Sequence, residues 1–442
     1  MVPVVPAPAR RTLGVGLITA ATAVMAGCTG GQGDAETSPS GSGSSAPLKD
    51  PSAPLVIGSV GTTDGFEGLV EKNIAVAIGE ALIDVNANGG VFGRPVTMLP
   101  RVQIAGSKPS PQEIVATLKA GKATVVLLSC TDEATFALAP LLASAGILGI
   151  SVTSTAMQLR KPEDHSKGML LRLVPSTALM AKHLTEAVLA GSGNGLTPRS
   201  AALVVRPGMR GDSLEQQLKQ TILPASGQLW TYRAAPGKPF AQAGELGARR
   251  PALTIIDAGD DAAAIVKAIR TSAPPQPQGT ERLELPMRLL TYATRDYNRI
   301  LPAGMLKGAT GERPGAPWSD PLRKMMIAAE ISMATSGFDF CAQAYDAVVL
   351  AALGASVAHH LEGSQIAAAI PTLLAGGTAV PSFAEAARAI RSSGGATDLA
   401  YVGFSGKLAL RDGELSSAQI STITYRDDNV MGDTSASEVT AG

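Results

Sequence analysis

Side chains that could bind a small polar molecule concentrate in six short segments, each of which follows an apolar run typical of a β-strand. The segments supply hydroxyl groups, carboxylates and a guanidinium, which bind ligands through hydrogen bonds and ion pairs. Because the carboxyl ends of parallel strands meet at one edge of a sheet, we expect these segments to line clefts. They span residues 61–68, 129–135, 152–156, 207–213, 257–261 and 292–297.

Sequence motifs of catalysis and of metal binding are missing. The four histidines, at positions 165, 183, 359 and 360, form no H-E-x-x-H pattern. Cys28, Cys130 and Cys341 are too far apart for a zinc pattern. There is no G-x-S-x-G nucleophile elbow and no P-loop. We therefore expect a binding protein without cofactor or metal, and not an enzyme.

The charge balance argues against a nucleic-acid partner. The 442 residues include 37 Lys and Arg and 37 Asp and Glu, so the formal net charge is zero. Phosphate backbones are bound by basic surfaces, and this composition provides no excess of basic residues. A hydrophobic content of 45% is that of an ordinary globular protein, and the length suits two or three domains.

Residues 1–28 have the pattern of an export signal. Arg10 and Arg11 precede an uncharged run, residues 13–25, that is too short to span a bilayer. The run ends in Met25-Ala26-Gly27-Cys28, which resembles a bacterial lipobox, in which the cysteine is lipidated after cleavage. We therefore expect a lipoprotein held at the extracytoplasmic face of the cell membrane. A plain secretory signal is the alternative, and the arginine pair leaves the twin-arginine export route open.

Residues 29–54 are expected to form a disordered tether. They are rich in Gly, Ser and Pro and contain almost no large apolar residue, so they cannot offset the entropy cost of ordering. A flexible coil of this length spans about 30 Å. No later run of 18 uncharged apolar residues occurs, so no further membrane span is expected.

The rest of the chain alternates strand-like and helix-like segments, and the pattern restarts after Pro175. This order predicts two α/β lobes, each with a parallel sheet covered by helices on both faces. Ser176 is the expected N-cap of a helix that runs to residue 190. Strands are predicted at 54–58, 96–99, 123–128, 147–150, 201–205, 252–256 and 288–291, and further helices at 73–86, 111–120, 134–145, 214–221 and 261–270.

Several stretches, in this order along the chain, resemble the branched-chain amino-acid-binding proteins. The family pattern D-I-N-A-x-G-G-V-x-G-R is similar to residues 84–94, and A-Y-D-A-V matches residues 344–348. The resemblance covers roughly residues 55–430. The other stretches are residues 145–151, 172–177, 401–406 and 412–414.

The resemblance implies the type I periplasmic binding fold, which has two doubly wound parallel-sheet lobes joined by a three-strand hinge. Lobe 1 is then residues 55–173 plus 305–417, and lobe 2 is residues 176–302 plus 418–430. Residues 431–442 remain as a C-terminal tail.

The same resemblance implies a function. Family members capture a small solute, here an amino acid or a related compound, by closing their lobes, and they deliver it to an ABC permease. The protein is then expected to act as a lipid-anchored monomer. The alternative is a lipid-anchored sensor that presents its closed state to a signalling partner.

Candidate ligand-binding residues on lobe 1 follow from the same resemblance. Thr131 and Asp132 stand where the family has a serine pair that binds the ligand carboxylate. Thr153, Ser154 and Thr155 fall in the family's S-P-x-A-T stretch. The carbonyl of Thr153 is then expected to accept from an ammonium, and the Thr155 hydroxyl to donate to a carboxylate.

Lobe 2 contributes Arg210, which stands where the family has an aromatic residue. It also contributes Asp296, which lies near, but not at, the position of the family's acidic partner for an ammonium. We expect Thr131, Thr155 and Arg210 to line one cleft between the lobes. Two interpretations stay open. Either the ligand has changed, with Asp132 recognising an amine or hydroxyls and Arg210 an anion, or Arg210 is a solvated rim residue and Asp132 caps the helix at 134–145.

A disulfide between Cys130 and Cys341 is a further prediction. By the family analogy both cysteines lie near the cleft in lobe 1, and they form the one pair left after lipidation of Cys28. Exported proteins mature in an oxidising compartment, where such a pair can be bridged. The alternative is two independent buried thiols.

Overall fold

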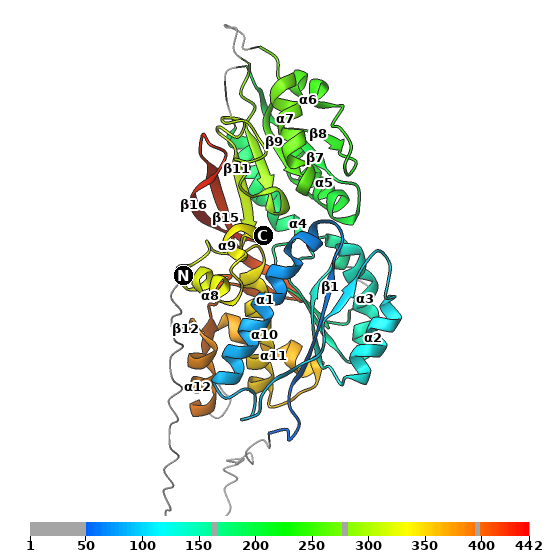
Figure 1. Cartoon of the computed structure of the whole chain (residues 1–442), viewed down its shortest axis with the longest axis vertical. Coiled ribbons are helices and arrows are strands. Elements are labelled where there is room, and N and C mark those ends of the chain that lie inside the picture. Colours follow the sequence, from blue (N-terminus) through cyan, green and yellow to red (C-terminus); the bar gives the residue numbers. More distant parts are fainter. Residues whose placement is uncertain are drawn as a thin grey trace, which may run out of the picture. The chain divides into compact units, whose positions relative to one another are not determined.

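The computed structural model describes residues 50–160, 166–191, 193, 195–275, 282–393 and 398–441. The predicted signal peptide, and the predicted tether up to residue 49, lie outside the described residues. Between residues 50 and 441 the described chain builds two lobes, each around its own β-sheet (Figure 1).

The sheet of lobe 1 is entirely parallel. Its order is β2-β1-β4-β5-β6, and β3 pairs with the second half of β1. All six strands run in the same direction, and helices α1 (Gly65–Ala87), α2 (Pro111–Ala120) and α3 (Asp132–Ser144) return the chain to the start of β2, β4 and β5. The strands are β1 (Val56–Thr62), β2 (Thr97–Met98), β3 (Val102–Ile104), β4 (Val125–Ser129), β5 (Leu148–Ser151) and β6 (Leu170–Arg172).

Helices cover both faces of this sheet. Successive residues of a strand point to opposite faces, so Val125 and Leu127 of β4 pack into one core, and Val126 and Leu128 pack into another. The first core is covered by α1, α10 (Cys341–Ala358), α11 (Gly363–Ala375) and α12 (Phe383–Ser393), and the second by α2 and α3.

The sheet of lobe 2 is mixed. Its order is β14-β15-β11-β10-β9-β7-β8, and β16 pairs with β15. Strands β7 to β11 are parallel, whereas β15 runs antiparallel to β11, β14 and β16. The strands are β7 (Thr197–Val205), β8 (Gln228–Arg233), β9 (Pro251–Asp257), β10 (Met287–Leu290), β11 (Thr310–Pro314), β14 (Ala409–Arg411), β15 (Glu414–Tyr425) and β16 (Met431–Thr440).

Helices also cover both faces of the second sheet. Ala201, Leu203 and Val205 pack on one side, and Ala202 and Val204 pack on the other. Two α/β lobes with parallel-sheet cores are thus confirmed (Figure 1). The first side carries α4 (Thr177–Ala190) and α5 (Met209–Ile222), and the second carries α6 (Ala243–Arg249) and α7 (Ala262–Ser272).

The structure differs from the predicted lobe boundaries at three places. Residues 409–411 and 414–417, expected in lobe 1, form β14 and the start of β15 in the second sheet. Residues 431–440, expected as a tail, form β16, which pairs along β15. The second crossing between lobes follows β11, at Pro314, whereas 305 was expected, because β11 is a member of the second sheet. The remaining elements are α8 (Asp320–Ala329), α9 (Met333–Ser336), β12 (Thr378–Val380), β13 (Leu399–Tyr401) and the 3-10 turns η1 (Met157–Leu159), η2 (Gly259–Asp261) and η3 (Thr291–Ala293).

Three of the stretches that resemble the family, residues 84–94, 344–348 and 401–406, join segments that are far apart in the sequence. Tyr345 donates a hydrogen bond to Asp84 Oδ2 at 2.8 Å, which joins α10 to α1. The Asp346 carboxylate is fully buried and accepts from the Tyr401 hydroxyl and from the Ser405 amide at 2.7 Å. These residues of α1, α10 and the segment 401–405 therefore fix the fold and do not line the interlobe cavity described below.

Helix α10 is long and apolar enough to cross a membrane by length and composition, the one such helix among the described residues. The sequence predicted no such segment after the signal. In the structure 83% of this helix is buried, between α1 and α11. It is the central helix of the lobe 1 core.

The predicted disulfide is wrong. Cys130 and Cys341 are both free and buried. The Cys130 thiol lies 3.5 Å from the carbonyl of Val60, in the core covered by α2 and α3. The Cys341 thiol lies 3.5 Å from the carbonyl of Asn73, in the core on the other face of the sheet. The sheet therefore separates the two sulfurs.

Candidate functional site

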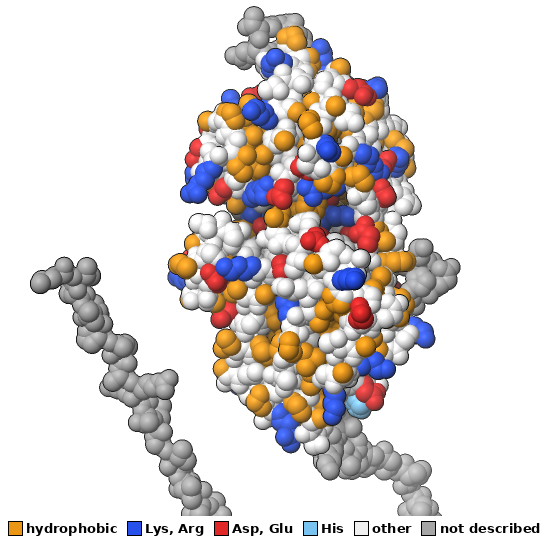
Figure 2. Space-filling view, turned by 45° about the vertical axis from the view of Figure 1, so that its right-hand side comes forward, with side chains coloured by type: hydrophobic (Ala, Val, Ile, Leu, Met, Phe, Trp, Pro, Cys, Tyr) orange, Lys and Arg blue, Asp and Glu red, His pale blue; other side chains and the backbone are white. Residues whose placement is uncertain are grey.

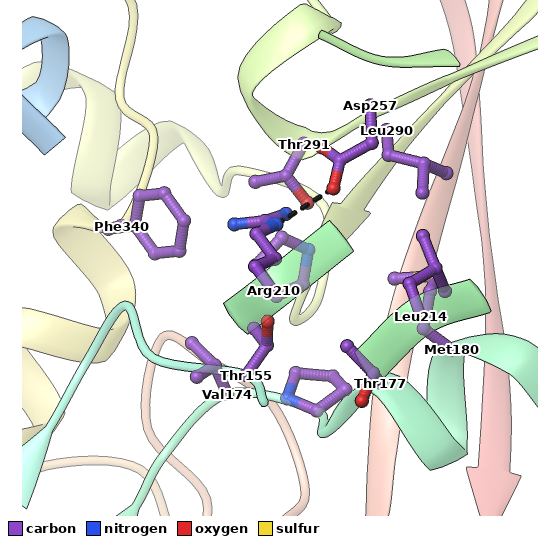
Figure 3. Close-up of a pocket in the computed structure, with 12 residues that line it drawn as sticks. Thr155, Val174, Thr177, Met180, Arg210, Leu214, Asp257, Leu290, Thr291 and Phe340 are labelled. Atoms are coloured by element: carbon purple, nitrogen blue, oxygen red, sulfur yellow. Dashed lines mark hydrogen bonds and ion pairs between the residues drawn. The ribbon is translucent and has the colours of Figure 1, made fainter. Parts of the chain in front are cut away.

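An internal cavity lies where the two lobes meet (Figure 3). About 410 Å³ of space not filled by atoms lies within its walls, the open solvent at its mouth included. Thr155, Arg210, Asp257 and Leu290 reach it from segments at or near the ends of strands, the first from lobe 1 and the others from lobe 2. Phe340 reaches it from lobe 1 at the start of α10. The lining residues are Thr155, Val174, Pro175, Thr177, Met180, Arg210, Leu214, Asp257, Leu290, Thr291, Pro314 and Phe340.

Arg210 is the central polar residue of this cavity. It stands in the first turn of α5, and its Nε donates to Asp257 Oδ2 at 2.8 Å. Its guanidinium lies 4.4 Å from the ring centre of Tyr292, in cation–π contact. Burial is the largest single effect and disfavours the charge of Arg210, but Asp257, Tyr292, Asp132 and Glu67 together outweigh it and raise the pKa of the guanidinium. With 17% of its side chain exposed, Arg210 is not a solvated rim residue.

Two buried oxygen atoms of the cavity have no hydrogen-bond partner among the described residues. They are Oγ1 of Thr155 and Oδ1 of Asp257. Figure 3 shows these two side chains on opposite sides of Arg210. A buried polar atom that lacks a partner costs about 1–3 kcal/mol, so a molecule that supplied donors to both atoms would be stabilised here.

Asp132 organises the lobe 1 wall of the site. Its carboxylate is 4% exposed, and Oδ1 accepts from the amides of Thr155 at 2.7 Å and Ala156 at 2.8 Å. Burial raises the pKa of Asp132, although the Ala156 amide and Arg210 act against that shift. Thr131, and not Asp132, caps α3, because its Oγ1 accepts from the Ala134 amide. The predicted capping role of Asp132 is therefore wrong.

Glu67 and Tyr292 contact each other across the lobes. The Tyr292 hydroxyl donates to Glu67 Oε1 at 3.3 Å. The Tyr292 ring lies between two phenylalanines of lobe 1, with centroid distances of 4.9 Å to Phe66 and 5.2 Å to Phe340. Burial raises the pKa of Glu67 to about 7, so this carboxyl group is only partly ionised at neutral pH.

A groove adjoins the cavity and shares Arg210 and Asp257 with it. Figure 2 shows charged side chains of both signs around the hollow between the lobes. Glu133 of lobe 1 closes the groove on one side, because its Oε1 accepts from the Met209 amide at the start of α5, at 2.7 Å. Arg206 closes it from lobe 2, 4.2 Å from the ring centre of Phe66.

The structure brings together some of the predicted site residues. Thr155 and Arg210 line the cavity, while Thr131 and Asp132 line the adjoining groove. Asp296 lies in a separate groove beside β16, where its Oδ1 accepts from the Met431 amide at 2.8 Å.

Thr153 and Ser154 line neither the cavity nor the groove. Both are 1% exposed, and both hydroxyls donate to the carbonyl of Cys130, at 2.9 Å and 3.3 Å. These two buried hydrogen bonds join the segment after β5 to the segment after β4.

The residues that sequence reasoning missed are Glu67, Asp257, Tyr292 and Phe340. The first three fall in the polar segments 61–68, 257–261 and 292–297, so their place after a strand was the available signal. Phe340 precedes α10 with a positive φ of 62°, far from any predicted segment. Although several carboxyl groups surround Arg210, no group of His, Cys, Asp and Glu in the described ranges is placed to hold a metal ion.

Comparison with known proteins identifies the fold. No protein-family model and no curated protein matches the sequence. Among solved structures, the isoleucine complex of the branched-chain amino-acid transporter binding protein LivJ from Streptococcus pneumoniae has a TM-score of 0.63 at 14% identity, covering 87% of this chain and 100% of that chain. The leucine-binding protein LivK from Thermotoga maritima has a TM-score of 0.61 at 13% identity, covering 87% and 99%.

A solute-binding protein of an ABC transporter from R. palustris, in complex with benzoate, has a TM-score of 0.61 at 13% identity and covers 88% of this chain and 98% of that chain. Identities this low show the fold alone. The chain therefore has the two-lobed fold of the type I periplasmic binding proteins, as the sequence motifs predicted.

Proposed function

We propose that this protein captures a small solute between its two lobes and delivers it to the permease of an ABC importer without converting it chemically. One observation carries the proposal: Thr155 Oγ1 and Asp257 Oδ1, from opposite lobes, line one buried cavity and have no hydrogen-bond partner among the described residues. A ligand that pairs with both atoms connects the lobes and stabilises their closed arrangement. The solved structures of the same fold support it, since they include complexes with isoleucine and benzoate.

Direct contacts between the lobes would accompany closure around the solute. Glu133 bonds to the Met209 amide, Tyr292 bonds to Glu67, and the Met157 amide donates to Ser213 Oγ at 2.9 Å. These are single hydrogen bonds, each worth about 1 kcal/mol net. The contacts of Tyr292 with Phe66 and Phe340 and of Arg206 with Phe66 add to them. A bound solute would add further contacts that only the closed state makes.

The proposal includes the position of the protein in the cell. We place it outside the cytoplasmic membrane, held by a lipid on Cys28 and a tether of residues 29–54. The support is the Met25-Ala26-Gly27-Cys28 pattern and the composition of residues 29–54. An anchored monomer of this kind remains close to a membrane permease while its lobes open and close.

A thermal-shift screen of the full-length protein tests solute capture. The screen contains amino acids, amides, amines, polyols and small carboxylic acids, since any ligand specific to the native state raises the melting temperature. We expect at least one class to do so, and Thr155→Val to weaken that ligand about five- to tenfold, the value of one hydrogen bond. Thr271→Val, an exposed position on α7, is the matched control. The proposal fails if no class raises the melting temperature. It also fails if Thr155→Val and Thr271→Val bind the ligand with the same affinity.

A further inference from the structure

We infer that the ligand of the interlobe cavity is a small amine with an apolar body and no carboxylate group. The inference rests on the proposed function and names the chemical class of the solute. Three features of the site point to it, namely the bonding of Asp132, the excess of carboxyl groups, and the unpartnered acceptors.

The first feature is that the chain's own carboxylate occupies two backbone amides in the lobe 1 wall of the site. The amides of Thr155 and Ala156 both donate to Asp132 Oδ1. A ligand carboxylate would find these two donors already used, and it would lie close to the negative charge of Asp132. Like charges at short distance in a buried site repel strongly, so the site disfavours carboxylates.

The second feature is the balance of charge around Arg210. Glu67, Asp132 and Asp257 all interact electrostatically with this one guanidinium. Asp257 also holds Nε of Arg210 at 2.8 Å, which neutralises the guanidinium within lobe 2. The second arginine of the groove, Arg206, pairs with Asp261, and Arg172 is the other cation that acts on Asp132. Neither Glu67 nor Asp132 forms an ion pair among the described residues, so a positively charged ligand would give these carboxyl groups a partner.

The third feature is the chemistry of the free atoms and the walls. Asp257 Oδ1 can only accept, so an ammonium can donate to it, while Thr155 Oγ1, on the other side of Arg210, can accept or donate a hydrogen bond. Phe340 offers an aromatic ring within the same cavity. The remaining wall is mostly apolar and therefore favours an apolar body; it includes Val174, Pro175, Met180, Leu214, Leu290 and Pro314.

The ionisation of Glu67 gives the sign of a pH effect on binding. Glu67 is faced by Arg210 from α5, by Asp132 from α3 and by Tyr292 from η3, and its pKa of about 7 follows mainly from burial. A bound cation favours the ionised carboxylate and lowers this pKa. Amine binding therefore releases protons and weakens as the pH falls below about 7, whereas binding of an anion would take up protons and strengthen.

Isothermal titration of the full-length protein with matched amines and acids tests the inference. The pairs are 3-methylbutylamine with 4-methylpentanoate, which are leucine without its carboxylate and without its amino group, and benzylamine with benzoate; leucine itself is the third type of ligand. We expect an amine to bind at least tenfold more tightly than its acid and than leucine. Its affinity should fall between pH 8 and pH 6, with proton release measured in buffers of different ionisation enthalpy.

Matched variants show where the amine binds. Asp257→Asn should weaken the amine at least tenfold, while Asp260→Asn, at an exposed position on the next turn, should leave its affinity unchanged. An acid or leucine that binds more tightly than the amine, or a polyol or amide as the sole ligand of the wider screen, overturns the inference and leaves solute capture standing. The absence of any ligand in that screen overturns the proposed function itself.

Discussion

At the scale of single residues, the site is defined by acids whose roles depend on tertiary contacts. Asp132 follows Thr131 at the end of β4, as the sequence predicted, but its partners are amides 23 and 24 residues away. No local pattern reveals such a pairing. The polar segments after the strands could therefore be found from the sequence, whereas the partners of Asp132, Glu67 and Asp257 could not.

Glu67 makes the stability of the ligand-free protein depend on pH. Its pKa is raised from 4.5 to about 7 in the folded state, so folding favours the protonated group. The stabilisation is complete below about 4.5 and is lost as the pH rises through about 7. The shift corresponds to at most about 3 kcal/mol.

Urea unfolding at pH 5 and pH 8 checks this pH dependence. Glu67→Gln should lower the difference in unfolding free energy between the two pH values, because the amide does not titrate. Glu385→Gln, at an exposed position on α12, is the control. It should show the same difference in unfolding free energy between pH 5 and pH 8 as the unchanged protein. Equal pH profiles for Glu67→Gln and the unchanged protein would contradict the assignment.

At the scale of elements, the strength of the local pattern decided what could be predicted. Helix α2 was predicted at its observed bounds, and the structure shows a strong local start signal, since Ser110 and Glu113 form a capping box and Pro111 starts the helix. The hairpin of β15 and β16 was missed, since β16 is polar and largely exposed and has no apolar alternation. The short strands β3 and β6 have only three residues each, too few for a periodic signal.

Helix α10 provides a prediction at this scale. Its Asp346 is fully buried and accepts from Tyr401, Phe404 and Ser405, which ties the helix to the last crossing between lobes. Asp346→Ala leaves these donors unpaired inside the core, and we expect a loss of about 3–5 kcal/mol in unfolding free energy by urea denaturation. Asp433→Ala, at an exposed position on β16, should stay within about 0.5 kcal/mol of the unchanged protein. Similar losses for the two variants would refute the role of Asp346.

At the scale of the whole molecule, the sequence motifs predicted two lobes and three crossings because they mark contacts between distant segments. The crossing at Pro314 and the pairing of β16 were not predicted, since sheet membership depends on neighbours that the local sequence does not encode. The electrostatic character of the cavity also appears only at this scale, where carboxyl groups of both lobes surround one arginine.

The proposed anchor gives a prediction for the intact protein. Cys28→Ala removes the thiol that would carry the lipid, so the protein should move from the membrane fraction to the soluble extracytoplasmic fraction. Two acyl-type anchors bind membranes stably, whereas the polar tether alone does not. Fractionation followed by immunodetection measures the change, with Ser40→Ala in the tether as control. A membrane-bound Cys28→Ala protein would contradict lipidation at this residue.

The central claim is that a solute binds between the lobes and holds them closed, and a distance measurement between the lobes tests it most directly. Spin labels on cysteines introduced at Lys119 of lobe 1 and Lys238 of lobe 2, both exposed, report that distance in the full-length Cys28→Ala chain. Cys130 and Cys341 are buried and should not react. With a saturating amount of the tightest-binding solute, we predict a shift to one narrow distance distribution, the closed state. An identical distribution with and without a bound solute would contradict the account.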